Sequence, residues 1–371
     1  MPTRRLLAAA LSALALGLLA ACAATPPPGA LESLADYPPL PAAPVPGASP
    51  AARRFAASLG RGVNFGNMLD APGEGAWSLR VEERFIARVG REGGLGIASV
   101  RLPVRWSNHA SADGDARIDP AFLSRVDDVV RRLLARGVPV VMDMHHYRQL
   151  DGDTLDPGEV RVPDAVVERR FLAMWRQIAE HFRDFPSALA FELYNEPHGR
   201  LERRWNDLMS RAVRVVRQSN PHRVLVVGPV QWNSARGLDQ LEMPPDADLV
   251  LTVHHYDPYG FTHQGAPWAN PPPPAGLDCC SARMQLDIRE PLDTAARWGR
   301  LHGYPVFVGE FGVYKAAPAD ARLRYARTMR EEIERRGMTW AYWELAAGFG
   351  FIDPATAWVS PGGLHEALFG P

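Results

Sequence analysis

The sequence is poor in lysine and cysteine and carries almost no net charge. Lys315 is its only lysine, so arginine supplies nearly all of the positive charge. Lysine and arginine together number 41, against 42 aspartates and glutamates, which gives a formal net charge of -1 at pH 7. A balance this even does not favour nucleic acid or another polyanion as a partner, and we expect no nucleic-acid partner.

Cysteine is too scarce to hold the fold together. After Cys22 only Cys279 and Cys280 remain, and they are neighbours in the chain. Adjacent cysteines cannot close a long loop, and a bond between them is strained. We therefore expect two free thiols in a loop, with a vicinal disulfide as the alternative.

Long apolar runs are missing except at the N-terminus. Two arginines precede an apolar stretch over residues 6–19, which ends in Leu-Ala-Ala-Cys at Cys22. This stretch is too short to span a bilayer comfortably and looks like a bacterial lipoprotein signal whose cysteine is acylated. The alternative is an ordinary signal peptide cut near Ala21 or Ala24. Both predict export, either lipid-anchored in the bacterial envelope (outer membrane or periplasm) or secreted.

Composition divides the chain into three parts. Residues 1–22 are the predicted lipoprotein-type signal peptide, with Cys22 as the mature N-terminus. Residues 23–50 are rich in proline and alanine, which predicts an extended spacer without a core of its own. Residues 51–371 have an ordinary globular composition and form the predicted catalytic domain, for which we expect a monomer.

Apolar strands alternate with helical patterns through this domain. The predicted strands are 62–65, 98–103, 138–144, 188–194, 223–227, 249–254, 305–309 and 339–343, and helical spacing marks 120–135, 169–182, 205–218 and 321–336. Strands that alternate with helices predict a parallel sheet, and a count near eight predicts a closed α/β barrel, the (β/α)8 or TIM barrel, as a single domain. No Gly-x-Gly-x-x-Gly follows a strand, which disfavours a dinucleotide-binding fold.

Two of these strands each deliver a glutamate at the carboxyl end. Residues 188–194 run into Asn195-Glu196-Pro197, and Pro197 must end the strand because it cannot donate to a sheet ladder. Residues 305–309 run into Glu310. The roughly 110 residues between them hold three βα units of roughly 35 residues, so the two acids should face each other across the barrel mouth. Two carboxyl groups placed in this way can hydrolyse a glycosidic bond.

The other predicted strands also end in hydrogen-bonding or aromatic side chains. A strand that simply leaves the core for water explains any one of them but not all of them, which favours a functional site at this end. These side chains, with those in the loops that follow, are Asn67, Arg101, Trp106, His109, Asp143, His145, His146, Gln231, Trp232, Asn233, His254, His255, Tyr256, Trp268, Trp343 and Glu344.

Five of these segments, in this order, resemble family 5 glycoside hydrolases, the cellulase family. They are Arg101-Leu102-Pro103, Asn195-Glu196-Pro197, His254-His255-Tyr256, Gly309-Glu310-Phe311-Gly312 and Trp343. The resemblance runs from about Arg61 to the C-terminus and is closest to bacterial endoglucanases, some of which also cleave mannan. It implies a retaining mechanism with Glu196 as acid/base and Glu310 as nucleophile, and it implies that Asn195 contacts the sugar 2-hydroxyl.

Charge and hydrogen bonding predict how the neighbours act on the two acids. Arg101 should lower the pKa of Glu310 and hold it ionised, because a guanidinium favours a nearby carboxylate. Tyr256 should donate to Glu310, and His254 should bridge the two carboxyl groups. Burial and the charge of Glu310 should raise the pKa of Glu196.

Further side chains are expected to contact substrate. Trp343 offers an apolar face to a sugar ring, although a core tryptophan is the alternative. Trp268 and Trp232 are expected as outer platforms, and Asn67 and His146 as sugar ligands. His145 is expected to orient Glu196 or the substrate.

The remaining acidic residues at this end are expected to be structural. Glu192 should pair with an arginine or a tryptophan nitrogen inside the barrel, and Asp143 and Glu344 should also support the fold. No His-Glu-x-x-His occurs and no cluster of metal ligands can be assembled from the sequence, so we expect neither a metal nor another cofactor.

Together these features predict an exported endo-β-1,4-glycanase of the cellulase type acting on a polysaccharide or oligosaccharide. Within enzymes, the alternatives are a β-mannanase and an exo-acting β-glucosidase. From other classes, the alternatives are a non-catalytic glycan-binding barrel and a metal-dependent hydrolase.

Overall fold

A computed structural model describes residues 34–371 of the chain. The predicted signal peptide, its Cys22 and the first part of the predicted spacer, residues 23–33, lie outside the described residues. Within 34–371, no helix combines the length and the apolar character that crossing a bilayer requires.

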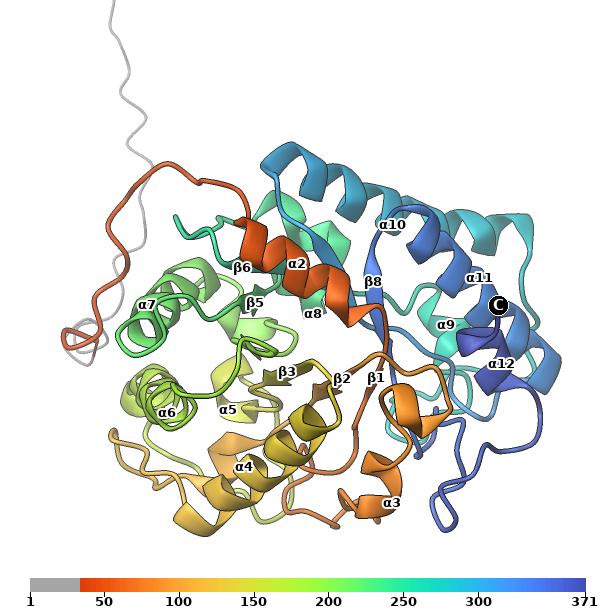
Figure 1. The fold of residues 1–371 in the computed structure, drawn as a ribbon, viewed down its shortest axis with the longest axis horizontal. Helices are drawn as coiled ribbons and strands as arrows, with labels where there is room; N and C mark the ends of the chain where they lie inside the picture. Colours follow the sequence, from red (N-terminus) through yellow and green to blue (C-terminus); the bar gives the residue numbers. More distant parts are fainter. Residues whose placement is uncertain (1–33) are drawn as a thin grey trace, which may run out of the picture.

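Eight parallel strands close into a barrel in chain order, and β8 pairs with β1 (Figure 1). They are β1 (Arg61–Asn64), β2 (Ser99–Leu102), β3 (Val140–Asp143), β4 (Leu189–Glu192), β5 (Leu225–Val227), β6 (Leu249–His254), β7 (Val306–Glu310) and β8 (Thr339–Tyr342). All eight predicted strands are present, and β6 has the predicted bounds. Most of the others are shorter than predicted, because their apolar runs continue into loops that leave the ladder.

Helices surround this barrel. They are α2 (Pro50–Leu59), α3 (Glu83–Ile86), α4 (Pro120–Ala135), α5 (Arg148–Asp151), α6 (Val167–His181), α7 (Trp205–Arg217), α8 (Val230–Asn233), α9 (Tyr259–Thr262), α10 (Ala282–His302), α11 (Ala319–Arg335) and α12 (Leu364–Phe369). Short 3₁₀ turns are η1 (Arg91–Gly93), η2 (Trp106–His109), η3 (Asp164–Val166), η4 (Gly199–Leu201) and η5 (Ala235–Asp239). The four predicted helices correspond to α4, α6, α7 and α11, and α4 has the predicted bounds.

The amino end of the barrel is closed by α2. Ser49 caps this helix by accepting from the Ala52 amide at 3.1 Å, and Pro50 stands in its first turn. Phe55 and Leu59 on its inner face pack against a small apolar cluster from inside the barrel, which includes Val141, Ala190, Val226, Val250, Phe307 and Ala341. Because apolar side chains fill the amino end of the barrel, a polar site is expected at the carboxyl end of the strands.

The described part of the predicted spacer packs against the barrel. Residues 34–49 contain no helix or strand, but Leu34 and Tyr37 are buried. The side chain of Arg211 in α7 donates to the Tyr37 carbonyl at 2.7 Å, and Ser210 accepts from the Leu40 amide at 3.1 Å. Residues 34–49 therefore have no helix or strand, as expected of a spacer, but two apolar side chains among the prolines anchor them to the domain, which proline content did not predict. The division at residue 50 stays a prediction.

The prediction of two free thiols is also wrong. Cys279 and Cys280 form a vicinal disulfide in the loop that leads into α10. The sequence could not decide this, because adjacency alone allows both states.

Candidate active site

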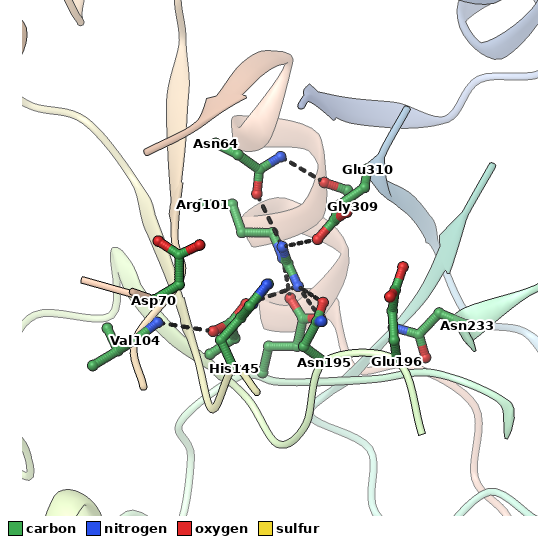
Figure 2. A network of polar contacts seen from close by, with 12 residues as sticks. Asn64, Asp70, Arg101, Val104, His145, Asn195, Glu196, Asn233, Gly309 and Glu310 are labelled. Carbon is green, nitrogen blue, oxygen red and sulfur yellow. Dashed lines mark hydrogen bonds and ion pairs between the residues drawn. The ribbon is translucent and has the colours of Figure 1, made fainter. Parts of the chain in front are cut away.

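Glu196 and Glu310 meet at the carboxyl end of the barrel, as predicted. Glu310 is the last residue of β7, and Glu196 follows β4 with a positive φ of 53° just before Pro197. A carboxylate oxygen of one lies within 4.8 Å of a carboxylate oxygen of the other. Both side chains point toward the same space in Figure 2.

Arg101 is the centre of the polar network beneath the two acids (Figure 2). It is fully buried on β2 and pairs with Glu192 through two bonds of 2.7 and 2.8 Å. It also donates to Glu310 at 2.7 Å and pairs with Asp143 at 2.8 Å. The predicted contact with Glu310 and the predicted partner of Glu192 are confirmed. One guanidinium thus serves three carboxyl groups.

Two asparagines complete this network. Asn64 on β1 accepts from Arg101 at 2.9 Å and donates to the Gly309 carbonyl at 2.9 Å, which ties β1 to β7. Asn195 accepts from Arg101 at 2.8 Å through its amide oxygen. That bond turns the amide nitrogen of Asn195 away from Arg101, and this nitrogen has no hydrogen-bond partner in the described part of the chain. Asn195 is therefore held as a donor at the edge of the cavity.

His145 is buried and contacts Asp143 rather than Glu196. Its Nδ1 lies 2.8 Å from Asp143 Oδ2, and its ring is parallel to that of Trp343 with centroids 5.6 Å apart. His145 was predicted to orient Glu196 or the substrate; these contacts do not support the first, and the second stays a prediction, since His145 lines the cavity. Asp143 instead links His145 to Arg101, which agrees with its expected structural role.

Glu310 has the predicted donors but not the predicted pKa. Tyr256 donates to its Oε2 at 2.9 Å and Arg101 to its Oε1 at 2.7 Å. Burial nevertheless raises the pKa of Glu310 to about 7, although His254 and Arg101 act in the opposite direction. The expectation of a lowered pKa is wrong, because Arg101 divides its charge among three carboxyl groups while Glu310 loses its contact with water.

Glu196 has a raised pKa, as predicted. Burial raises it to about 7 against the positive charges of His198 and Arg101, and the charges of Glu192 and Asp143 make smaller contributions to the rise. His254 lies with its Nδ1 2.8 Å from Glu196 Oε1 and 3.8 Å from Glu310 Oε2, so the predicted bridge between the acids is present. Burial lowers the pKa of His254 to about 4, which keeps this bridge neutral at neutral pH.

These residues face a cavity of about 1030 Å³. Every predicted contact residue except Arg101, which lies beneath the floor, lines it: Asn67, His145, His146, Asn195, Glu196, His254, Tyr256, Trp268, Glu310 and Trp343. A cavity of this size suits a ligand of several sugar units.

Aromatic rings line the cavity on several sides. Trp343 is partly exposed into it rather than being a core residue, and its ring fits because a Cβ on Gly66 would lie 2.8 Å from it. Trp268 is 58% and Trp232 53% exposed, and both line the cavity as expected of outer platforms. Trp232 stacks on His198, whose pKa is raised to about 9 by Asp153 and Asp151 against the effect of burial.

Several site residues were not identified from the sequence. Asn64 and Trp77 were missed, and so were Tyr314, Lys315 and Phe349, all but Asn64 lining the cavity. Trp77 lies in the long loop after β1 and meets the His146 ring at 5.8 Å. A lone tryptophan in a polar loop was the available signal. Lys315 follows Glu310 by five residues, and its being the only lysine was the signal there.

Two groups of side chains have the composition of a metal site. Glu196, His254 and Glu310 form one, and Asp70, His145 and His146 form the other, with ligand atoms within 4.8 Å of one another in each. The expectation that no such cluster can be assembled is therefore wrong. Asp70, however, already accepts the backbone amides of Asn67 and Met68 at 3.0 and 2.8 Å, so it has a clear role in shaping the loop after β1.

The chain matches known proteins over most of its length. A model of the cellulase family, glycosyl hydrolase family 5, matches residues 91–348. Endoglucanase H of Acetivibrio thermocellus is 32% identical over 303 residues, which are 80% of this chain and 30% of that protein. Cellulase/esterase CelE of the same organism is 29% identical over 320 residues, 80% of this chain and 36% of that protein. The chain thus spans about a third of the length of these two relatives.

Solved structures share this fold over nearly the whole length of their own chains. A hyperthermophilic endo-β-1,4-glucanase in complex with substrate is 32% identical with a TM-score of 0.79, covering 86% of this chain and 99% of that one. Thermotoga maritima Cel5A in complex with mannotriose is 34% identical with the same TM-score, covering 86% of this chain and 100% of that one. With the family match over residues 91–348, these likenesses show that the chain belongs to glycosyl hydrolase family 5, the cellulase family.

Proposed function

We propose that this protein is a retaining endo-β-1,4-glycanase that cleaves β-glucan, with Glu310 as nucleophile and Glu196 as acid/base. The observation that carries the proposal is the separation of the two acids. Oxygens of Glu196 and Glu310 lie within 4.8 Å of each other. Retaining enzymes hold their carboxyl groups about 5 Å apart, whereas inverting enzymes need at least about 6.5 Å to admit a water.

The hydrogen bonds divide the roles between the two acids. Glu310 accepts from Arg101 and Tyr256, both of which favour its ionised form, whereas His254 is the partner of Glu196. When the pair holds one proton, that proton therefore resides on Glu196. The Glu310 carboxylate attacks the anomeric carbon, and Glu196 gives its proton to the departing glycosidic oxygen. A water then attacks the glycosyl-enzyme, giving its proton to Glu196 and releasing Glu310.

The supporting residues act on the sugar in this proposal. Asn195 donates through its free amide nitrogen to the hydroxyl next to the reacting carbon. Trp343 packs against the apolar face of the sugar at the point of cleavage, with Asn67 and His146 nearby. Trp232 and Trp268 extend the surface outward, and platforms beyond the acids favour cleavage within a chain over removal of a terminal sugar.

Mannan is a second candidate substrate. It is supported by the likeness to Thermotoga maritima Cel5A, which has been solved in complex with mannotriose. Hydrolysis of carboxymethylcellulose, lichenan, glucomannan and galactomannan, with product lengths resolved, separates glucanase from mannanase and endo from exo action.

Replacing each acid tests the proposal. Glu310→Gln should abolish turnover of every substrate, because no nucleophile remains. Glu196→Ala should lose activity on β-glucan but keep the first step on aryl glycosides with good leaving groups, and azide should restore turnover and give a product of retained configuration. An azide product of inverted configuration would contradict these roles.

The rival functions give different results. A glycan-binding barrel would bind cello-oligosaccharides without cleaving them. A metal-dependent hydrolase would lose activity in EDTA and regain it with added metal, whereas we expect activity to survive EDTA.

We also propose that the protein is exported and held to a membrane by a lipid on Cys22, acting as a monomer. The proposal rests on the apolar segment that ends in Leu-Ala-Ala-Cys. Cys22→Ser should move the protein from the membrane fraction to the soluble fraction. A Cys22→Ser protein that still pellets with membranes would show that the lipid is not the anchor.

A further inference from the structure

Asn233 is a buried polar residue behind the acid pair that the proposed function does not yet use. Its side chain is fully buried, and its Nδ2 lies 3.5 Å from His254 Nε2. Its Oδ1 has no hydrogen-bond partner in the described part of the chain. Figure 2 shows Asn233 beside Glu196, on the side of Glu196 that faces away from Arg101.

The backbone around Asn233 is arranged to place this side chain. Gln231, Trp232 and Asn233 have φ values of 59°, 58° and 55°, three successive residues in the left-handed region. Residues other than glycine rarely occupy this region, and such strain persists only where the surrounding structure imposes it. The turn sends Trp232 outward to the cavity rim and Asn233 inward to His254.

Two glycines make room for the contact. A Cβ on Gly228 would lie 2.2 Å from Asn233 Oδ1, and a Cβ on Gly309 would lie 2.9 Å from His254 Nε2. The amide and the imidazole can therefore each lie directly against backbone. Their positions are fixed by packing as well as by hydrogen bonding.

The two nitrogens of His254 have different surroundings. Nδ1 faces Glu196 at 2.8 Å and Glu310 at 3.8 Å, whereas Nε2 faces the amide of Asn233. Arg101 and Glu192 are the other charged groups that act on this ring. A neutral imidazole carries one proton, and two carboxyl groups draw it to Nδ1. Nε2 then carries a lone pair and needs a donor.

The amide of Asn233 supplies that donor. Reversing the amide would turn Oδ1 toward the lone pair on Nε2, which is repulsive, and would bury the two N–H hydrogens against Gly228. A buried amide nitrogen without a partner is costlier than a buried carbonyl oxygen without one. The orientation with the nitrogen toward His254 is therefore the more stable one.

We propose that Asn233 is a positioning residue that holds His254 in its Nδ1–H tautomer. His254 then donates to Glu196 Oε1, so the acidic proton of Glu196 must occupy Oε2, on the side of the leaving glycosidic oxygen. The catalytic role given to the proton on Glu196 Oε2 rests on the proposed function. The tautomer of His254 is a property of the resting protein and does not depend on that function.

The first experiment measures the tautomer directly in the whole protein. Isotope-labelled histidine and nitrogen-detected NMR distinguish a protonated Nδ1 from a protonated Nε2, and His254→Ala identifies the signal among the 11 histidines. We expect Nδ1 protonated and Nε2 free. A wild-type His254 with its proton on Nε2 would overturn the proposal, with or without any measured activity.

The second experiment reverses the polarity of the contact. Asn233→Asp is nearly isosteric but offers only acceptors, so Nε2 should take a proton, visible in the same NMR spectrum. Glu196 then either turns its proton toward His254 or loses it at lower pH to an imidazolium. In both cases kcat/KM on cellotetraose should fall about 100-fold. The alkaline limb of its pH profile should move to lower pH only in the second case, because in the first case the lone pair on Nδ1 stabilises the protonated form of Glu196.

Two comparisons separate positioning from general damage. Dinitrophenyl β-cellobioside needs little proton donation, so its kcat/KM should fall about tenfold or less in Asn233→Asp. Thr252→Val is the matched control, because Thr252 is buried near the same two glycines and its hydroxyl has no hydrogen-bond partner among residues 34–371. It should leave both substrates and the tautomer unchanged. Equal losses on both substrates would show that Asn233 only supports the fold.

Discussion

The two ends of the barrel each bury an arginine, and the two arginines have opposite surroundings. Arg101 at the carboxyl end contacts Glu192, Glu310 and Asp143. Arg223, just before β5 at the amino end, donates instead to backbone carbonyls, those of Phe182, Phe185, Pro186 and Leu189. The carboxylates hold the pKa of Arg101 well above its usual range, whereas burial lowers the pKa of Arg223 to about 10.

This difference separates groups that serve the fold from groups that serve chemistry. Arg223 donates to neutral carbonyl oxygens. These hydrogen bonds satisfy its buried charge and join strands to helices. Arg101 is outnumbered three to one by carboxyl groups, so the carboxyl end keeps an excess of negative charge. Such an excess is unfavourable for stability, but it adds to burial, the larger cause, in raising the pKa of Glu196 toward neutrality, where an acid/base catalyst is most useful.

The largest effect is expected when the carboxyl-end arginine is removed. Arg101→Met should lower kcat/KM on β-glucan by at least about a thousandfold, because Glu310 loses a charged partner and Asn195 its anchor. It should also destabilise the protein by about 3–5 kcal/mol at neutral pH, since Glu192, Glu310 and Asp143 lose the cation that pairs with them. Initial rates and urea unfolding at pH 7 measure the two effects.

The amino-end arginine is the matched variant. Arg223→Met should destabilise the protein by about 2–4 kcal/mol, because several buried carbonyls lose a donor worth about 1 kcal/mol each. Below the unfolding transition its kcat/KM should equal that of the wild type. If Arg223→Met lowers kcat/KM as much as Arg101→Met does, the division between the two ends is wrong.

The sequence predicts much of the carboxyl end because its residues follow strands in chain order. Glu196, Glu310, Arg101 and Tyr256 could be placed from apolar runs that end in polar groups. Asn64 could not, and Asn233 could be placed at this end but not assigned a role, because an asparagine within or after an apolar segment has no pattern of its own. Their roles depend on which strand end or ring lies opposite, and only the closed barrel decides that.

Two other differences between expectation and structure, one at the site and one before α2, have the same origin. The pKa of Glu310 was expected to fall because its contact with Arg101 could be foreseen, but the competing contacts of Arg101 with Glu192 and Asp143 could not. Leu34 and Tyr37 anchor the segment before α2 because α7 offers Ser210 and Arg211 to it, which proline content alone does not reveal. In both cases contacts with residues far away in the sequence decided the outcome.

The smallest expected effect is the pH dependence of stability, which tests how far burial and the neighbouring carboxyl group outweigh Arg101 at Glu310. The pKa of Glu310 is about 7 in the folded protein, against an ordinary value of 4.5. Between these values the folded state binds more protons than the unfolded state, so ionisation of Glu310 removes stability as the pH rises from 4.5 to 7. Gln at this position cannot ionise but keeps an oxygen that can accept from Arg101.

Glu310→Gln should therefore be more stable than the wild type at pH 8, by about 2 kcal/mol, with the difference shrinking as the pH falls toward 4.5. Urea unfolding of both proteins at several pH values measures it. Glu242→Gln, which removes an exposed carboxylate, should show no such trend. A Glu310→Gln protein that is less stable than the wild type at pH 8 would mean that Arg101 balances the carboxyl end more fully than its shared contacts suggest. The site would then hold its nucleophile ionised without a sacrifice of stability.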